Sequence, residues 1–119
     1  MCLSVDLDAA GRIDVPDIVA CAKDGDRAST LLWDAACTAI AIASVNLHHA
    51  FNPQYIILGG GMAAAGSFLL DTVRRKFAAL KWTLAEDHPE IRLATLGGNA
   101  GAIGAAGWFL HLRNSGAAC

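Results

Sequence analysis

The longest hydrophobic pattern in the chain runs from Asp26 to about Ala50 at helical spacing. Small and apolar residues recur at helical spacing, at Leu32, Ala35 or Ala36, Ala39, Ile42 or Ala43, and the pattern continues to Asn46. This predicts an amphipathic helix of about seven turns. Because its inner side is built of small residues, another helix or a sheet can approach it closely. Asn52-Pro53 ends it, since proline disfavours helical backbone in the residue before it.

Two short apolar runs predict strands. Residues 55–58 form an unbroken run rich in β-branched types, bounded by Pro53 and by three glycines, as is typical of a strand buried on both faces. Residues 91–96 alternate apolar and polar types and predict a second strand. Between them, residues 64–80 show helical periodicity, so strand, glycine turn and helix form one continuous unit.

Three further elements complete the pattern. A short helix is predicted from Pro16, beside acidic residues, to about Lys23. Residues 1–7 alternate and predict a short strand. A last helix is predicted from about Ala100 to Leu112, and the glycines inside it cost roughly 1 kcal/mol each relative to alanine. We therefore expect close packing around that helix to offset its glycines.

The order of these elements predicts an α/β fold with helices packed on a small sheet, and one domain over residues 1–119. The chain is 55% hydrophobic and 17% charged, which is enough apolar material for one compact domain. Much of that material is alanine, which buries little area. Either the domain is alanine-rich and self-contained, or some apolar surface is meant for a partner or for a missing part of the same chain.

Charge gives no sign of a nucleic-acid partner. The net charge is −2, and the nine Lys and Arg residues are scattered apart from Arg74, Arg75 and Lys76, which we expect to be a solvated helix face. No uninterrupted apolar window of membrane length and no targeting segment is found, so the sequence predicts no membrane span. The scattered cysteines, expected to be reduced thiols, predict a cytoplasmic protein.

The cysteines and histidines suggest no metal site. Cys2, Cys21, Cys37 and Cys119 lie far apart without CxxC spacing, and we expect reduced thiols. His48 and His49 are neighbours on the long helix and point about 100° apart, which favours ordinary surface groups over joint ligands.

The most informative stretch is residues 56–62, Ile-Ile-Leu-Gly-Gly-Gly-Met. It places bare backbone at the carboxyl end of a strand, the usual ligand position in open α/β sheets, where a flat ring or a phosphate can approach. Alternatively, the glycines only make a tight turn. The stretch is neither a G-x-G-x-x-G dinucleotide fingerprint nor a P-loop.

Three segments, residues 23–28, 52–61 and 96–106, resemble in order and spacing the C-terminal part of ROK-family proteins (repressor, open reading frame, kinase). The resemblance covers nearly the whole chain. It implies an actin-like, ribonuclease-H-like fold in which ATP lies in a cleft between two lobes. This chain would hold the C-terminal lobe and be incomplete relative to the family.

The resemblance also implies a binding site. Gly59, Gly60 and Gly61 would pack against the adenosine of ATP, and Met62 would line the pocket, so that residues 56–62 are the adenosine motif. The helix over residues 99–112 resembles the element that crosses near the interlobe hinge; plain tight packing is the alternative. ATP is the expected cofactor, with Mg²⁺ in the complete enzyme and a hexose as substrate.

The family's catalytic base, phosphate loops and zinc cluster have no matching motif in this chain. Asp6, Asp8, Asp24 and Asp26 are expected to be solvated or to cap helices, so no catalytic residue and no metal ligand is assigned.

Three functions remain open at this point. The chain would be the ATP-binding part of a glucokinase or N-acyl-hexosamine kinase, inactive alone; the sugar-sensing part of a ROK-type repressor; or a non-catalytic packing or oligomerisation module. The expected partners are a nucleotide, a hexose in the complete protein, and either further copies of the chain or a missing N-terminal lobe.

Overall fold

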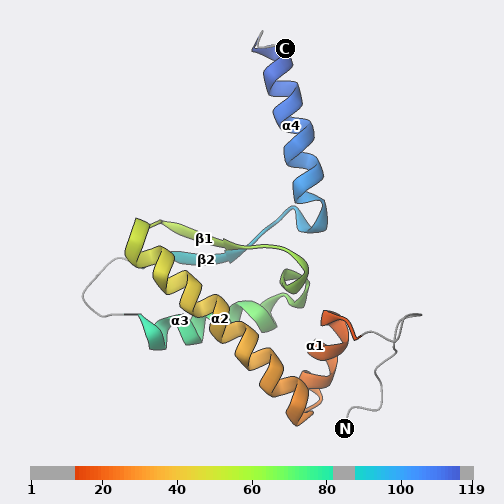
Figure 1. The fold of residues 1–119 in the computed structure, drawn as a ribbon, viewed down its shortest axis with the longest axis vertical. Helices are drawn as coiled ribbons and strands as arrows, with labels where there is room; N and C mark the ends of the chain where they lie inside the picture. The colour runs from red at the N-terminus through yellow and green to blue at the C-terminus, as the bar shows by residue number, and fades with distance from the viewer. Residues whose placement is uncertain (1–12, 82–87, 116–119) are drawn as a thin grey trace.

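The structure is a computed structural model that describes residues 13–81 and 88–115. In chain order the elements are α1 (Val15–Lys23), α2 (Arg27–Phe51), β1 (Tyr55–Leu58), the 3₁₀ helix η1 (Gly61–Ala65), α3 (Ser67–Leu80), β2 (Glu90–Leu93), the 3₁₀ helix η2 (Gly97–Asn99) and α4 (Ala100–Asn114) (Figure 1). The strand predicted in residues 1–7 lies outside the described residues. The mixed α/β class is confirmed, with more helix than strand.

The two strands form one parallel pair joined through α3. Tyr55 lies opposite Glu90 and Leu58 opposite Leu93. The pairing continues past the strand ends, since the amide of Ala94 donates to the carbonyl of Leu58 at 2.8 Å. Parallel pairing brings the carboxyl ends of both strands, and the glycine turns that follow them, to one edge of the sheet.

Helices cover one face of this sheet. Ile56 and Ile91, opposite each other in the register, are buried in the core cluster that α2 and α3 share. Tyr55 and Ile57 point the other way and are 50% and 65% exposed. The prediction that residues 55–58 are buried on both faces is therefore wrong, because no described residue covers the outer face.

The core lies where α2 crosses α3. Cys37, Ala41 and Val73 are fully buried there, so small residues of α2 do allow α3 to approach. They are not the residues predicted for the inner side: Leu32, Ala39 and Ala43 are exposed, because the core face of α2 is the neighbouring stripe that contains Trp33, Cys37 and Ala41. The ring of Trp33 stacks on that of Phe68, with centroids 5.2 Å apart. Burial of this apolar surface, at roughly 25 cal/mol per Å², is the main stabilising term for the fold.

Local capping fixes where the first two helices begin and end. Asp14 and Asp17 form a capping box at the start of α1, beside Pro16. Asp26 caps α2 by accepting from the Ser29 amide at 2.9 Å, which confirms the capping expected there. α2 ends at Asn52, whose left-handed conformation (φ 45°) precedes proline.

Two boundaries differ from the prediction. The helix expected over residues 64–80 is interrupted at Gly66, whose φ of +62° suits glycine and separates η1 from α3. β2 ends at Leu93, three residues earlier than predicted, since the chain then turns into η2. In both places a glycine-containing turn decides the boundary.

α4 extends away from the rest of the molecule (Figure 1). None of its residues is buried, and a Cβ built on Gly101, Gly104 or Gly107 meets nothing within 4 Å. The radius of gyration is 18.2 Å, whereas a compact domain of this length has about 13.5 Å. The close packing predicted to offset the glycines is therefore not found among the described residues.

Two expectations about titratable side chains on α2 and α1 are wrong. His48 is buried, because it faces α3 and its ring lies edge-on to Phe77, whereas His49 is exposed. Cys21 is disulfide-bonded rather than reduced. Cys37 is a buried free thiol, and burial raises its pKa.

α2 is long and apolar enough to cross a membrane, by length and hydropathy alone. The core helix of a soluble protein has the same properties, and α2 carries Trp33, Cys37 and Ala41 into the core described above. Packing among the described residues accounts for only part of its apolar composition, since 28% of the apolar window is buried and Leu31, Ile42 and Phe51 remain exposed.

Candidate functional site

The glycine turn follows β1 directly, at the carboxyl end of the sheet. Gly60 has φ +82° and ψ −171°, a conformation that only glycine adopts without strain. Its carbonyl accepts from the amide of Ala63 at 3.1 Å, which starts η1. Gly60 is therefore required by the backbone itself.

The other two glycines differ from Gly60. A Cβ on Gly59 would lie 3.6 Å from the Cβ of Ala94, an ordinary contact with the segment that follows β2. A Cβ on Gly61 would meet nothing within 4 Å, and its φ is not in the left-handed region. The missing side chain of Gly61 thus leaves open space rather than relieving strain.

That space belongs to a pocket of about 280 Å³ between α1 and η1. Its lining residues are Val15, Pro16, Val19, Ala20 and Lys23 from α1, and Gly61, Ala64 and Ala65 from η1. Small-molecule sites are mostly apolar with a few placed polar groups, and this volume of about 280 Å³ lies just below their usual range of about 300–1,000 Å³. An apolar slot of this size with one cation suits a flat ring that carries a negative group.

The cation is Lys23, in the last turn of α1. Its Nζ lies 5.4 Å from the centroid of the Phe68 ring, close enough for a cation–π interaction. Phe68 is in turn stacked on Trp33. The lysine is thereby held at the pocket by the packing of α2 and α3.

The structure separates the residues that the sequence grouped together. Gly61 lines the pocket, Gly59 backs the end of β2, and Met62 packs against the core and is not a lining residue. Neither Lys23 nor the pocket wall formed by α1 was predicted from the sequence to bind a ligand. The apolar face of α1 could have indicated this wall from the sequence. That face ends at Lys23, which is the first residue of the family-like segment 23–28.

The glycine turn after β2 lies beside the one after β1, because η1 and η2 contact each other. Leu96, immediately before η2, is 52% exposed. The carboxyl edge of the sheet therefore carries two neighbouring glycine-rich turns with exposed backbone, the position where open α/β sheets bind ligands.

A second hollow lies at the opposite ends of the strands. It has a volume of about 630 Å³ and is lined by Asn52, Pro53, Gln54, Tyr55, His88 and Glu90. The carboxylate of Glu90 pairs with Arg92, whose guanidinium hydrogen bond lowers the pKa of Glu90. Arg92 also lies over the Tyr55 ring, 4.5 Å from its centroid. The carboxylate of Glu90 and the guanidinium of Arg92 therefore neutralise each other at this hollow.

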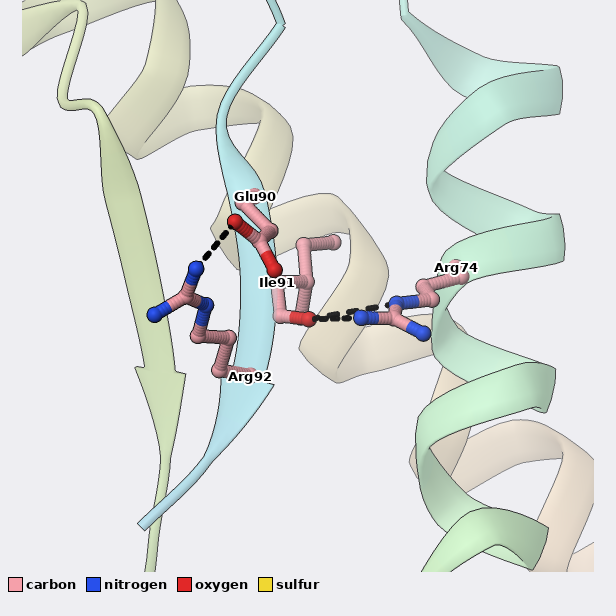
Figure 2. Close-up of polar contacts among 4 residues, drawn as sticks. All are labelled: Arg74, Glu90, Ile91 and Arg92. Carbon is pink, nitrogen blue, oxygen red and sulfur yellow. Dashed lines mark hydrogen bonds and ion pairs between the residues drawn. The ribbon is translucent and has the colours of Figure 1, made fainter.

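The basic triplet on α3 is partly structural, contrary to the solvated face expected for it. Figure 2 shows Arg74 donating from two nitrogens to the carbonyl of Ile91, at 3.1 and 2.6 Å. Lys76 pairs with Asp34 of α2 at 2.7 Å. Arg74 therefore ties α3 to β2, and Lys76 ties it to α2.

Most of the sequence matches one known protein family. The model of the ROK family matches residues 7–111. The chain is 34% identical to a glucokinase of Halalkalibacterium halodurans over 113 residues, 95% of this chain and 34% of that protein. It is 30% identical to a glucokinase of Thermotoga maritima over 80% of this chain and 30% of that protein.

A solved structure is also similar. The crystal structure described as a sugar kinase from Cytophaga hutchinsonii superimposes with a TM-score of 0.69 at 26% identity, over 89% of this chain and 35% of that one. The chain thus spans about a third of the length of the proteins it resembles. Because the family model covers most of the sequence and the fold agrees, the chain belongs to the ROK family, within the actin-like ATPase superfamily.

Proposed function

We propose that this chain supplies the adenosine-binding part of an ATP-dependent hexose kinase of the glucokinase type. In the complete enzyme the γ-phosphate of ATP passes to a sugar hydroxyl. The proposal includes the expectation that the chain is one lobe of an actin-like fold and acts in the cytoplasm. The observation that carries it is the pocket beside Gly61, at the carboxyl edge of the sheet.

The pocket suits the nucleoside end of ATP better than its phosphate end. Its walls are aliphatic and its volume of about 280 Å³ leaves room for a purine ring. Lys23 is the cation among its lining residues and could meet a phosphate at the mouth. No described residue is assigned to Mg²⁺ or to the catalytic base, and we place both in the part of the family fold that this chain does not span. On that basis the chain alone binds ATP weakly and transfers no phosphate.

A titration of the ¹⁵N-labelled chain with ATP tests the proposal. We expect weak binding, with a dissociation constant on the order of 1 mM. The largest amide shifts should fall at Gly60, Gly61, Ala64 and Lys23. Adenosine monophosphate should reproduce these shifts, whereas inorganic tripolyphosphate should not, because the pocket holds the nucleoside.

Two matched variants locate the site. Ala20 is exposed and lines the pocket, whereas Ala39 is exposed on α2 outside it. Ala20→Phe should fill the pocket and weaken ATP binding at least about fivefold, and Ala39→Phe should leave the affinity unchanged. Equal behaviour of the two variants, or shifts confined to other surfaces, would refute the assignment. A chain that binds hexose but no ATP would instead favour the sugar-sensing part of a repressor.

A further inference from the structure

Three imidazole rings gather at the amino edge of the sheet, where α2 ends. The ring centroid of His48 lies 5.6 Å from that of His49 on the same helix and 6.4 Å from that of His88, which precedes β2. The same ring lies edge-on to Phe77 of α3, with centroids 6.0 Å apart. His48 is thus the point at which α2, α3 and the segment leading into β2 meet.

His48 occupies this position as a buried side chain with one unsatisfied nitrogen. Its exposed fraction is 3%, and its Nδ1 has no hydrogen-bond partner among the described residues. A neutral imidazole carries one donor and one acceptor nitrogen, whereas a protonated imidazole carries two donors and a full charge. A buried charge without a partner is strongly unfavourable. The site therefore suits the neutral ring and not the protonated one.

The described groups that act electrostatically on His48 are all cationic when charged. Burial lowers the pKa of His48 most, and His49 on α2, His88 before β2 and Lys81 at the end of α3 lower it further. No carboxylate is among these described neighbours. The carboxyl end of a helix favours a cation, but the exposed His49 gains from that position without the cost of burial. Protonation therefore places like charges side by side around a buried ring.

The hollow of about 630 Å³ at this edge brings water close to the cluster, since the exposed His88 lines it. Two backbone hydrogen bonds close the structure here. The amide of Asn52 donates to the carbonyl of His48 at 2.8 Å, and the amide of Glu90 donates to the carbonyl of Gln54 at 2.9 Å. Loosening these two bonds lets the ring of His48 reach water while the core further along α2 stays intact.

We propose that His48, His49 and His88 form a pH-sensitive latch at the amino edge of the sheet. Above about pH 7 the neutral rings pack together and hold the end of α2 against α3 and the start of β2. As the pH falls through about 6.5, the open form, in which His48 is in water, takes up a proton that the closed form disfavours. The latch therefore opens on the acid side and uncovers the hollow, while the pocket at the opposite, carboxyl edge keeps its shape. This inference does not depend on nucleotide binding.

Hydrogen exchange of the full 119-residue chain tests the latch. One imidazole that is protonated only in the open form raises the open population about tenfold between pH 7.5 and 5.5. We therefore expect the protection factors of the Asn52 and Glu90 amides, corrected for the intrinsic pH dependence of exchange, to fall about tenfold over this range. Low concentrations of urea should leave their exchange at pH 5.5 unchanged, because a local opening exposes little new surface. The amide of the fully buried Ala41, in the middle of α2, should exchange faster in urea, since it requires global unfolding.

Three variants assign the effect to the cluster. His48→Phe keeps an aromatic ring beside Phe77 but takes up no proton, so it should abolish the tenfold change. His49→Gln combined with His88→Gln, at two exposed positions, removes two cationic neighbours and should reduce the change at least about twofold. His111→Gln, at an exposed position on α4, is the matched control and should leave the change intact.

Three results would overturn the latch. The first is protection of the Asn52 and Glu90 amides that does not change with pH. The second is a urea dependence of these amides equal to that of Ala41, which would mean global unfolding. The third is a full pH effect in His48→Phe. If His48→Phe does not fold, the double variant decides, and an undiminished change there overturns the proposal equally.

Discussion

The glycine turn offers a comparison between two adjacent residues with opposite expected effects. Gly60→Ala forces a Cβ into φ +82°, ψ −171°, a region reserved for glycine, which costs of order 1–3 kcal/mol. In Gly61→Ala the new Cβ meets no atom within 4 Å, and the φ of residue 61 is not in the left-handed region. Alanine there restricts the unfolded chain and should stabilise the fold by about 0.4–1 kcal/mol.

The expected difference between the two variants is thus about 1.4–4 kcal/mol. Unfolding entropy is about 2.1 cal/mol/K per residue, so for 119 residues this corresponds to a gap of about 6–16 °C in thermal midpoint. Circular dichroism at 222 nm during heating, together with urea titration at 25 °C, measures it. We expect Gly60→Ala to melt below the parent chain and Gly61→Ala at or slightly above it.

Two results would contradict strain at Gly60: equal thermal midpoints for the two variants, or a Gly60→Ala variant as stable as the parent chain. Either result would mean that the turn relaxes at little cost and that Gly60 is not required by the backbone. An unchanged midpoint combined with altered ATP binding would shift the role of Gly60 from the fold to the ligand.

Three further predictions follow from other parts of the chain. Arg74→Met removes two donors to the Ile91 carbonyl and should lower the free energy of unfolding, measured in urea, by about 1.5 kcal/mol. The same change at Arg75 should leave that free energy nearly unchanged. Equal losses in the two variants would contradict the role of Arg74 in joining α3 to β2. Gly104→Ala should stabilise α4 by about 1 kcal/mol and slow the hydrogen exchange of its amides about fivefold. An unchanged exchange rate would mean that contacts outside the described residues already stabilise α4. Burial and the nearby His49, His88 and Lys81 lower the pKa of His48 below its usual 6.5, so the folded state binds fewer protons than the unfolded state. Stability should therefore fall as pH drops through about 6.5, and a midpoint that falls equally in His48→Leu would refute this origin.

Helix ends were predicted correctly where capping residues and proline determine them. The helix after Pro16 and the long helix after Asp26 begin at acidic caps, and the long helix ends at Asn52, because capping and proline act within a few residues. The glycine turn after Leu58 was recognised for the same reason. The 3₁₀ turn before Gly66 was missed, since only the backbone angle shows that this glycine interrupts the helix.

Burial could not be predicted equally well. His48 and His49 are indistinguishable by type and spacing, yet one faces α3 and the other solvent. Lys23 gained its place in the candidate site only because α1 folds back against η1. Similarly, the glycines of α4 suggested close packing that no described residue provides.

The sequence by itself determined the order of helices and strands, the caps that bound them, and the family, because these depend on neighbouring residues and on short motifs. Only the tertiary structure decided which glycine opens onto a pocket, which histidine is buried, and which surfaces are left bare. Those properties depend on what lies opposite a residue in space, and for α4 and the outer sheet face no described part of this chain lies there.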